Sequence, residues 1–316
     1  MEYRNFGKTS VVVSRIGLGS HMFPLKDPRW DGYHGKGIRE DVIYEEKRIV
    51  FERALALGVV LFDCDFDFEK TLVGRIVNDL GNRSEVVLAS WIDYRPDNPQ
   101  EVDWNRFVQS FDEMLEKLQT DYLDILNWRF GSGFAVPAFT DAFQRQIDDL
   151  KAAGKLRATA FYTGDGSDDL ICEAAMSGIC DALFRGFGLL NPQANERVLP
   201  LCEEKDLGFL GFIPFQKGWF FECAKEAMLM GDGGAEVARL GLKWVLEHSA
   251  VSSTLVGVST LAELEANCAA VDVCPLLDIE HERLMRLVQT STYERYLKLM
   301  KEQNPLVLRD WRKSRR

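Results

Sequence analysis

The chain has 316 residues, of which 46% are hydrophobic and 28% are charged, and it carries a formal net charge of −11. This length and apolar content are ample for one large core, so we expect a single domain over residues 1–316. The basic residues are scattered over most of the chain. Nucleic acid is therefore an unsuitable partner, because phosphate binding needs clustered Lys and Arg.

The seven cysteines stand singly, without a Cys-x-x-Cys pair or another metal-ligand spacing. Such usage is typical of reduced thiols that are buried as small apolar groups. The sequence shows neither a leader-like segment nor an apolar run of about 18 residues. We therefore predict a cytoplasmic protein that spans no membrane and holds no metal.

Short apolar runs alternate along the chain with amphipathic stretches. Eight runs are candidates for buried strands: 16–18, 60–62, 86–89, 123–126, 156–161, 182–184, 207–212 and 253–256. Apolar side chains recur at helical spacing over 49–55, after the first run, and over 104–118, between the third and the fourth. Strand–helix units joined by right-handed crossovers predict an α/β fold, the (β/α)8 barrel, followed by one C-terminal helix over 279–302.

In such a barrel, functional side chains follow the C-terminal ends of the strands. Those positions here are polar or aromatic: Ser20, His21, Asp63, Cys64, Asp65, Trp91, Asp93, Asn127, Arg129, Tyr162, Thr163, Arg185, Phe187, Lys217, Gly257 and Ser259. They predict a barrel mouth that binds a small molecule. Guanidinium groups suit carboxylate or phosphate, so Arg129 and Arg185 favour an anionic substrate.

The segment 23–41 is long and rich in aromatic and glycine residues. A long loop at a barrel mouth commonly serves as a lid over a ligand. The same segment could instead make a dimer contact. The sequence leaves open whether the protein is a monomer or a homo-oligomer.

Motifs at the predicted strand ends carry a family resemblance. They occur in 1–20, 58–68, 85–90, 121–126, 154–157, 210–218, 243–246, 255–260 and 264–267. In order and spacing they resemble the aldo-keto reductase superfamily over nearly the whole chain. The resemblance implies the same barrel, preceded by an N-terminal β-hairpin.

The resemblance also implies a reductase site, in which a Tyr assisted by Lys, His and Asp protonates a carbonyl while a nicotinamide supplies a hydride. Asp63 keeps the family's Asp, whereas Phe68, Trp91 and Arg129 stand at the positions of the Tyr, Lys and His. A benzyl ring has no proton to donate, and a guanidinium is a poor proton shuttle. We therefore predict that ordinary carbonyl reduction is weak or absent.

The cofactor implied by the resemblance is NADP or NAD. The residues assigned to it are Phe187, Pro214, Lys217, Gly218, Gly257, Ser259 and Asn267. Tyr162, Thr163 and Phe184 replace the family's polar side chains that hold the nicotinamide amide. No basic residue stands near Ser259 for a 2′-phosphate, which weakens any preference for NADP over NAD.

The catalytic candidates are Asp63, His21, Tyr162 and Arg129, and the candidates for the substrate pocket are Phe68, Trp91, Asp93 and Arg185. Each catalytic candidate also has a structural interpretation. Asp63 could anchor strand-end groups, and Arg129 could be its ion-pair partner. His21 could be a spectator at the mouth, and the ring of Tyr162 could fill the nicotinamide space.

Three hypotheses about function follow. The first is an enzyme with atypical chemistry at the barrel mouth, either redox with a relocated donor or a non-redox elimination or isomerisation. The second is an NAD(P)H-dependent carbonyl oxidoreductase in which Tyr162 or His21 donates the proton. The third is a noncatalytic protein that binds a cofactor or metabolite and has a regulatory role. The variety of titratable groups at the mouth favours the first.

Overall fold

The computed structural model describes residues 1–19, 40–92, 94, 102–130, 136–163, 168–231, 233–271 and 275–302. His21 and Asp93 lie outside these ranges. So does the predicted lid at 23–41, except for its last two residues, which begin the first helix. The side chain of Arg129 is likewise outside the described part, although its backbone is described.

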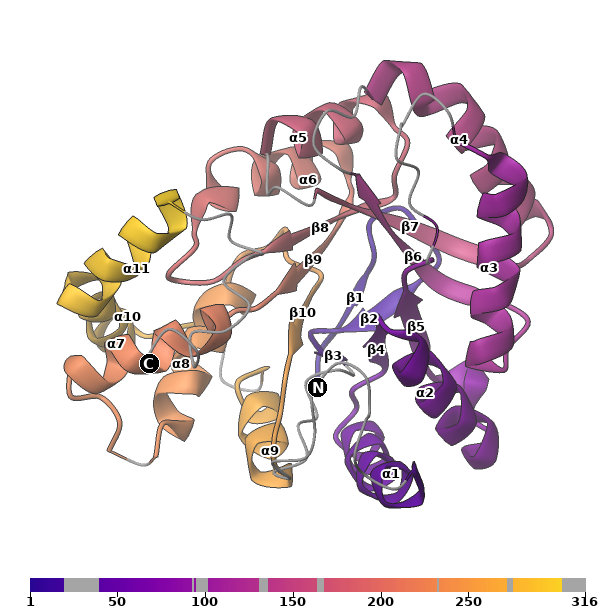
Figure 1. Cartoon of the computed structure of the whole chain (residues 1–316). Coiled ribbons are helices and arrows are strands. Elements are labelled where there is room, and N and C mark those ends of the chain that lie inside the picture. The colour runs from indigo at the N-terminus through magenta and orange to yellow at the C-terminus, as the bar shows by residue number, and fades with distance from the viewer. Residues whose placement is uncertain are drawn as a thin grey trace.

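A closed barrel of eight parallel strands forms the centre of the molecule, with helices around it (Figure 1). Its strands are β3 (Ile16–Gly19), β4 (Leu61–Cys64), β5 (Val87–Ser90), β6 (Leu123–Phe130), β7 (Leu156–Thr163), β8 (Ala182–Gly186), β9 (Gly208–Phe212) and β10 (Ser253–Val256). They follow the chain order, and β10 pairs with β3 to close the ring. The predicted (β/α)8 barrel is confirmed.

The helices that follow the strands surround the barrel (Figure 1). They are α1 (Glu40–Ala56), α2 (Asp67–Leu80), α3 (Trp104–Leu118), α4 (Val136–Ala152), α5 (Asp168–Ser177), α6 (Val198–Lys205), α7 (Trp219–Glu226), α8 (Ala235–Leu246) and α9 (Leu261–Ala269). In α3, the apolar stripe is buried and Asp103 caps the first turn by accepting the backbone N–H of Arg106. Four 3₁₀ turns are described as well: η2 (Arg83–Glu85), η3 (Gln193–Asn195), η4 (Gln216–Gly218) and η6 (Leu287–Gln289).

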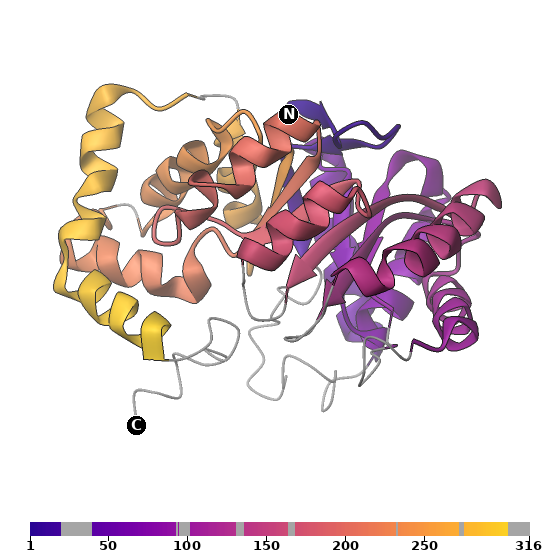
Figure 2. The ribbon, with the colours of Figure 1, turned by 90° about the horizontal axis from the view of Figure 1, so that it is seen from above.

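An N-terminal hairpin closes the N-terminal end of the barrel. Its strands are β1 (Tyr3–Asn5) and β2 (Val12–Ser14), and it lies across one end of the molecule in Figure 2. Phe6, Val11 and Val13 are fully buried and join the apolar cluster inside the barrel. A side chain on Gly208, the first residue of β9, would come within 2.8 Å of the Phe6 ring, so glycine is required there. The predicted hairpin is confirmed.

The C-terminal region is not one helix over 279–302 as predicted. It forms α10 (Asp278–Met285) and α11 (Ser291–Glu302), separated by η6. Thr290 has an extended backbone, and its hydroxyl accepts the N–H of Tyr293 at 3.2 Å. Glu226 of α7 accepts the N–H groups of Ser291 and Thr292. These contacts satisfy the first amides of α11 and start a new helix there.

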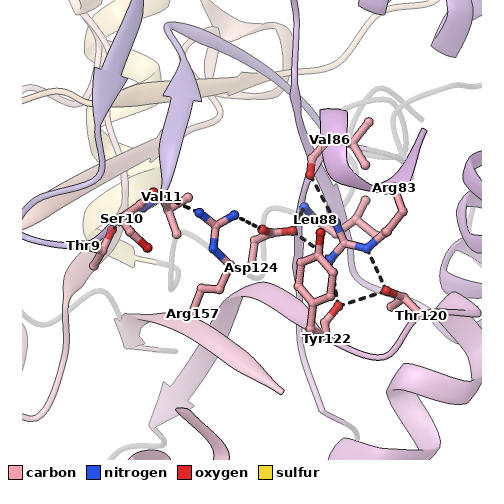
Figure 3. Close-up of polar contacts among 10 residues, drawn as sticks. All are labelled: Thr9, Ser10, Val11, Arg83, Val86, Leu88, Thr120, Tyr122, Asp124 and Arg157. Carbon is pink, nitrogen blue, oxygen red and sulfur yellow. Dashed lines mark hydrogen bonds and ion pairs between the residues drawn. The ribbon is translucent and has the colours of Figure 1, made fainter. Parts of the chain in front are cut away.

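Asp124 of β6 joins several elements at the N-terminal end of the barrel (Figure 3). Its buried carboxylate accepts Arg157 Nη1 at 2.6 Å, Arg83 Nη2 at 2.9 Å and the N–H of Leu88 at 3.0 Å. Arg157 also donates to the carbonyl of Ser10 in the hairpin at 2.9 Å. One carboxylate therefore links β5, β6, β7, η2 and the hairpin.

Replacing Asp124 should destabilise the fold strongly. Asp124→Asn leaves two guanidinium groups without their carboxylate, and breaking a buried pair in this way costs about 3 kcal/mol or more. The exposed pair between Asp112 and Lys155 offers a matched control, because Asp112→Asn should cost about 1 kcal/mol or less. Urea unfolding of both variants measures the difference. Equal losses of stability would contradict the role given to Asp124.

Candidate active site

Asp63 stands inside the barrel at its C-terminal mouth. Along β4, Leu61 packs in the inner cluster and Phe62 in the outer one, so strand alternation directs Asp63 inward. Its side chain is only 3% exposed, and Asn127 Nδ2 of β6 donates to its Oδ1 at 2.8 Å. The carboxyl of Asp63 is therefore held within the barrel by a neutral amide.

The surroundings of Asp63 favour its protonated form. Burial raises the pKa of this carboxyl well above its usual range, and the negative charges of Asp65 and Glu69 raise it further. The hydrogen bond from Asn127 acts in the opposite direction, and it does not offset the other causes. A raised pKa of this kind is what a carboxyl needs to act as a general acid.

Aromatic rings fill the mouth beside Asp63. Trp91, Tyr162, Phe184 and Phe212 all pack with the inner cluster. The Tyr162 ring lies 5.4 Å from Trp91 and 5.5 Å from Phe212, and Phe184 lies 4.6 Å from Phe212, all between ring centroids. Tyr162 and Phe184 are buried, while Trp91 and Phe212 are partly exposed. The partly exposed rings can pack against a ligand that enters the mouth.

Phe68, at the position of the missing Tyr, packs against the outer apolar cluster near the start of α2. Lys47 of α1 places its Nζ 5.9 Å from the centroid of this ring. Burial lowers the pKa of Lys47 to about 8, although the negative charge of Glu69 acts in the opposite direction. Glu69, itself buried, accepts the N–H groups of Asp65 and Phe66 at 3.0 and 3.1 Å. The buried carboxylate of Glu69 thus supports the turn that follows Asp63.

The two arginines predicted to bind an anion differ in what the structure describes. The backbone of Arg129 pairs with Tyr162 in the sheet, whereas its side chain is outside the described part. Arg185 alternates outward from Phe184. Its Nε donates to Asp168 of α5 at 2.8 Å, and its Nη1 donates to the carbonyl of Gly186. The guanidinium of Arg185 is therefore engaged on the outer side of the barrel.

The predicted cofactor residues lie in three places. Phe187 is fully buried in the outer core, with its ring 5.3 Å from Trp244. Pro214 to Gly218 form the loop after β9, in which Gln216 and Lys217 have positive φ angles of 47° and 54°. The amide oxygen of Gln216 accepts the hydroxyl of Tyr296 in α11 at 3.0 Å. Non-glycine residues at positive φ are uncommon outside ligand clamps and tight turns.

The third place is the N-terminal end of α9, near Gly257, Ser259 and Asn267. Glu263 accepts the N–H of Ser259 at 2.7 Å, and the hydroxyl of Thr260 accepts the N–H of Glu263 at 3.1 Å. Thr260 thus caps α9, and the carboxylate of Glu263 takes the Ser259 amide that an anion would otherwise bind. Asn267 is buried on the same helix. A phosphate at Ser259 would therefore face the carboxylate of Glu263.

These residues do not fit an oriented NADP. Tyr162 and Phe184, at two of the three positions that the resemblance gives to the nicotinamide amide, pack against each other with ring centroids 5.7 Å apart. Together they offer one hydroxyl in place of amide-binding side chains. Glu263 disfavours a 2′-phosphate at the other end. The loop after β9 meets no such conflict among the described residues, so a diphosphate fits better than the nicotinamide or the 2′-phosphate.

A cavity of about 360 Å³ lies at the opposite end of the barrel, between the C-terminal ends of α2 and α3. Arg83 and Tyr122 line it, and the Arg83 guanidinium already donates to Thr120, Val86, Tyr122 and Asp124. Residues at the N-terminal end of a barrel usually serve stability. We therefore place the candidate active site at the mouth.

Three further findings concern the described residues alone. Their six cysteines are buried and form no disulfide. They contain no group of three or more His, Cys, Asp or Glu side chains arranged to hold a metal ion. None of their helices is long and apolar enough to cross a membrane.

Comparison with known proteins identifies the family. The sequence profile of the Aldo/keto reductase family matches residues 15–289. L-galactose dehydrogenase of Arabidopsis thaliana is 26% identical, covering 90% of this chain and 92% of the relative. Aldo-keto reductase YhdN of Bacillus subtilis is 27% identical, covering 84% of this chain and 87% of the relative. The solved holo form of aldo-keto reductase AKR11C1 from Bacillus halodurans is similar in fold, with a TM-score of 0.71 and 18% identity. The match covers 91% of this chain and 96% of that protein's chain.

The chain therefore belongs to the aldo/keto reductase family. The resemblance seen in the motifs is confirmed, and so is the fold. The chemistry predicted for the altered positions is a separate question, because the matched relatives share only about a quarter of the sequence.

The structure adds residues that the sequence did not single out as parts of a site. Glu69 supports the turn after β4, Lys47 is buried near the Phe68 ring, and Phe212 belongs to the ring cluster. Asn127 was noted at the mouth without a role, and it now contacts Asp63. Alternation along β6 and β9 was a usable signal for Asn127 and Phe212, because both lie two residues beyond an inner apolar residue.

The raised pKa of Asp63 should make stability depend on pH. In the folded state Asp63 keeps its proton at pH values where the unfolded chain has lost it, so the stability from Asp63 is fully present below the unfolded pKa and is lost as pH rises through the folded pKa. The variant Asp63→Asn cannot ionise, so its stability relative to wild type should increase between about pH 5 and about pH 8. Urea unfolding at both pH values measures this, with Asp112→Asn as the exposed control. A constant difference would show that Asp63 titrates normally.

Proposed function

We propose that this protein is an enzyme that transfers protons on a small polar molecule at the barrel mouth, in an isomerisation or elimination, and is a weak carbonyl reductase. The observation that carries the proposal is the buried carboxyl of Asp63, held by Asn127 and raised in pKa by its surroundings. A buried carboxyl whose pKa is raised above its usual range is a suitable general acid.

Each residue of the mouth has a separate role in this mechanism. Asp63 donates its proton to an oxygen of the substrate, and Asn127 orients the Asp63 carboxyl through its amide. Trp91 and Phe212 present partly exposed rings to the apolar side of the molecule. Arg129, whose backbone stands opposite Tyr162, remains the predicted partner of an anionic group. A nicotinamide would supply a hydride when bound, and none of these four roles depends on it.

The altered family positions support proton transfer over hydride transfer. Phe68 offers no phenol, and it packs against the outer core. Tyr162 and Phe184 give packed rings where the resemblance places the nicotinamide amide. For the location in the cell we keep the cytoplasmic assignment as part of this proposal, and for the oligomeric state we leave monomer and homo-oligomer open.

A second candidate is an NAD(P)H-dependent carbonyl oxidoreductase in which Tyr162 is the relocated proton donor. The observation that favours it is the place of the Tyr162 ring inside the mouth, in contact with both Trp91 and Phe212. Family membership supports this candidate as well. It differs from the first in requiring a hydride, so one experiment can separate the two.

The test is hydrogen exchange in D₂O. Small α-hydroxy aldehydes and ketones, including glyceraldehyde, dihydroxyacetone and L-galactose, are incubated with the protein without cofactor, and deuterium at carbon is followed by NMR. The wild type should catalyse incorporation into at least one compound. Asp63→Asn should reduce that rate by about 100-fold or more, which is the ordinary contribution of a general acid. Asp112→Asn, far from the mouth in an exposed ion pair, should retain the wild-type rate.

The same compounds are then assayed for oxidation of NADH and NADPH. We expect very weak turnover in the wild type, because no Tyr, Lys or His stands at the family's donor positions. Robust oxidation that Tyr162→Phe abolishes, without any deuterium incorporation, would overturn the proposal in favour of the reductase. Absence of both activities over the panel would count against either enzyme.

A further inference from the structure

Two polar atoms at the mouth have no hydrogen-bond partner among the described residues. They are Asn127 Oδ1 and Trp91 Nε1, and both atoms are buried. Asn127 as a whole is only 1% exposed, and the Nδ2 of the same carboxamide donates to Asp63 at 2.8 Å. A buried donor or acceptor without a partner is costly, so two such atoms at one mouth indicate that a ligand or water completes them.

The sheet brings these two residues side by side. In the register of β5 and β6, Ser90 pairs with Leu126. The next residue along the chain is Trp91 in the first case and Asn127 in the second. The residues two positions before Trp91 and Asn127 both belong to the inner cluster, so strand alternation directs both side chains into the barrel. The contact of Asn127 with Asp63 and the packing of Trp91 on the inner cluster agree with this direction.

The two atoms are complementary in their hydrogen-bonding chemistry. An indole N–H only donates, and a carboxamide oxygen only accepts. Both groups are neutral, so they suit a neutral part of a ligand that offers one acceptor and one donor close together. A carbonyl oxygen with a hydroxyl on the next carbon has this arrangement. The partly exposed rings of Trp91 and Phe212 can pack against its carbon atoms.

We propose that Trp91 and Asn127 form a binding pair for a small α-hydroxy carbonyl compound, in which Trp91 Nε1 donates to the carbonyl oxygen and Asn127 Oδ1 accepts the adjacent hydroxyl. This inference rests on the proposed function, for which it names the substrate class and two residues that select it. A compound without the hydroxyl leaves the Asn127 oxygen unpaired, so the binding pair discriminates against it. The contact between Asn127 and Asp63 places the bound compound beside the buried carboxyl.

NMR of the indole N–H groups in protein labelled with ¹⁵N-tryptophan tests the binding pair, with Trp91 assigned from the spectrum of Trp91→Phe. Hydroxyacetone should shift the Trp91 resonance in a saturable way. Acetone, which lacks the hydroxyl, should bind about tenfold more weakly, the ordinary effect of one hydrogen bond. Trp219 is the internal control, because its Nε1 is also buried without a described partner but lies on α7, outside the mouth. Its resonance should not move.

Substitutions separate the two contacts, with the affinities measured by saturation-transfer NMR of the ligands. Asn127→Leu should weaken hydroxyacetone by about tenfold and remove its advantage over acetone, an effect that a merely structural role of Asn127 does not produce. Trp91→Phe should weaken both ketones by a similar factor, because both carry the carbonyl. Trp219→Phe should change neither affinity. Circular dichroism checks that each variant is folded.

The outcomes distinguish this inference from the proposed function. A Trp91 resonance that hydroxyacetone does not move, or equal affinities of the wild type for the two ketones, would overturn the binding pair. Hydrogen exchange in D₂O by the wild type would then leave the proposed function standing. Selective binding of hydroxyacetone that both substitutions weaken, without any exchange in D₂O, would instead support the binding pair and overturn the proposed function alone.

Discussion

The burial of the Asp63 carboxyl is the constraint on which the site depends. A carboxylate taken out of water must find compensating donors or keep its proton, because the cost of an unpaired buried charge is several kcal/mol. Here the described donor is one neutral amide, and the charges of Asp65 and Glu69 oppose ionisation of Asp63. The barrel provides no cation at the position of the family's Lys, where Trp91 packs against Tyr162 instead. Binding a proton therefore removes the negative charge that no described cation offsets at Asp63.

The rest of the fold keeps this arrangement rigid. The hairpin and Asp124 close the N-terminal end, so that the inner apolar cluster can pack up to the level of the rings at the mouth. Glu69 holds the turn that carries Asp65, because it accepts the backbone N–H groups of Asp65 and Phe66. A site built on strand ends and an anchored turn can keep its groups within the small tolerances that proton transfer requires.

Much of the architecture was predictable from sequence because it depends on local periodicity. Apolar runs such as 182–184 and the helical stripe over 104–118 predicted elements that the structure contains as β8 and α3. The break between α10 and α11 was not predictable in this way, because Glu226, which binds the first amides of α11, comes from another helix 65 residues away along the chain. Helical propensity alone continues through Thr290.

The candidate site was predictable to a similar extent. The positions of the predicted strand ends identified Asp63, Trp91 and Tyr162 as site residues. In the structure, Trp91 and Tyr162 pack in the same inner cluster. Lys47 was missed because a lysine in an acidic helix is ordinarily exposed, and only the packing of α1 beside α2 buries it. The partners Asp63 and Asn127 are 64 residues apart, so the contact needs the closed barrel. For Phe187, the predicted cofactor role remains a prediction, while its ring packs in the outer core.

The most direct test of this account is the protonation state of Asp63 at neutral pH. Infrared difference spectroscopy between the wild type and Asp63→Asn reports whether a carbonyl stretch of a protonated carboxylic acid is lost with the substitution. We expect this band in the wild type at about pH 7 and its absence from the variant. A difference spectrum that contains only the bands of an ionised carboxylate would contradict it.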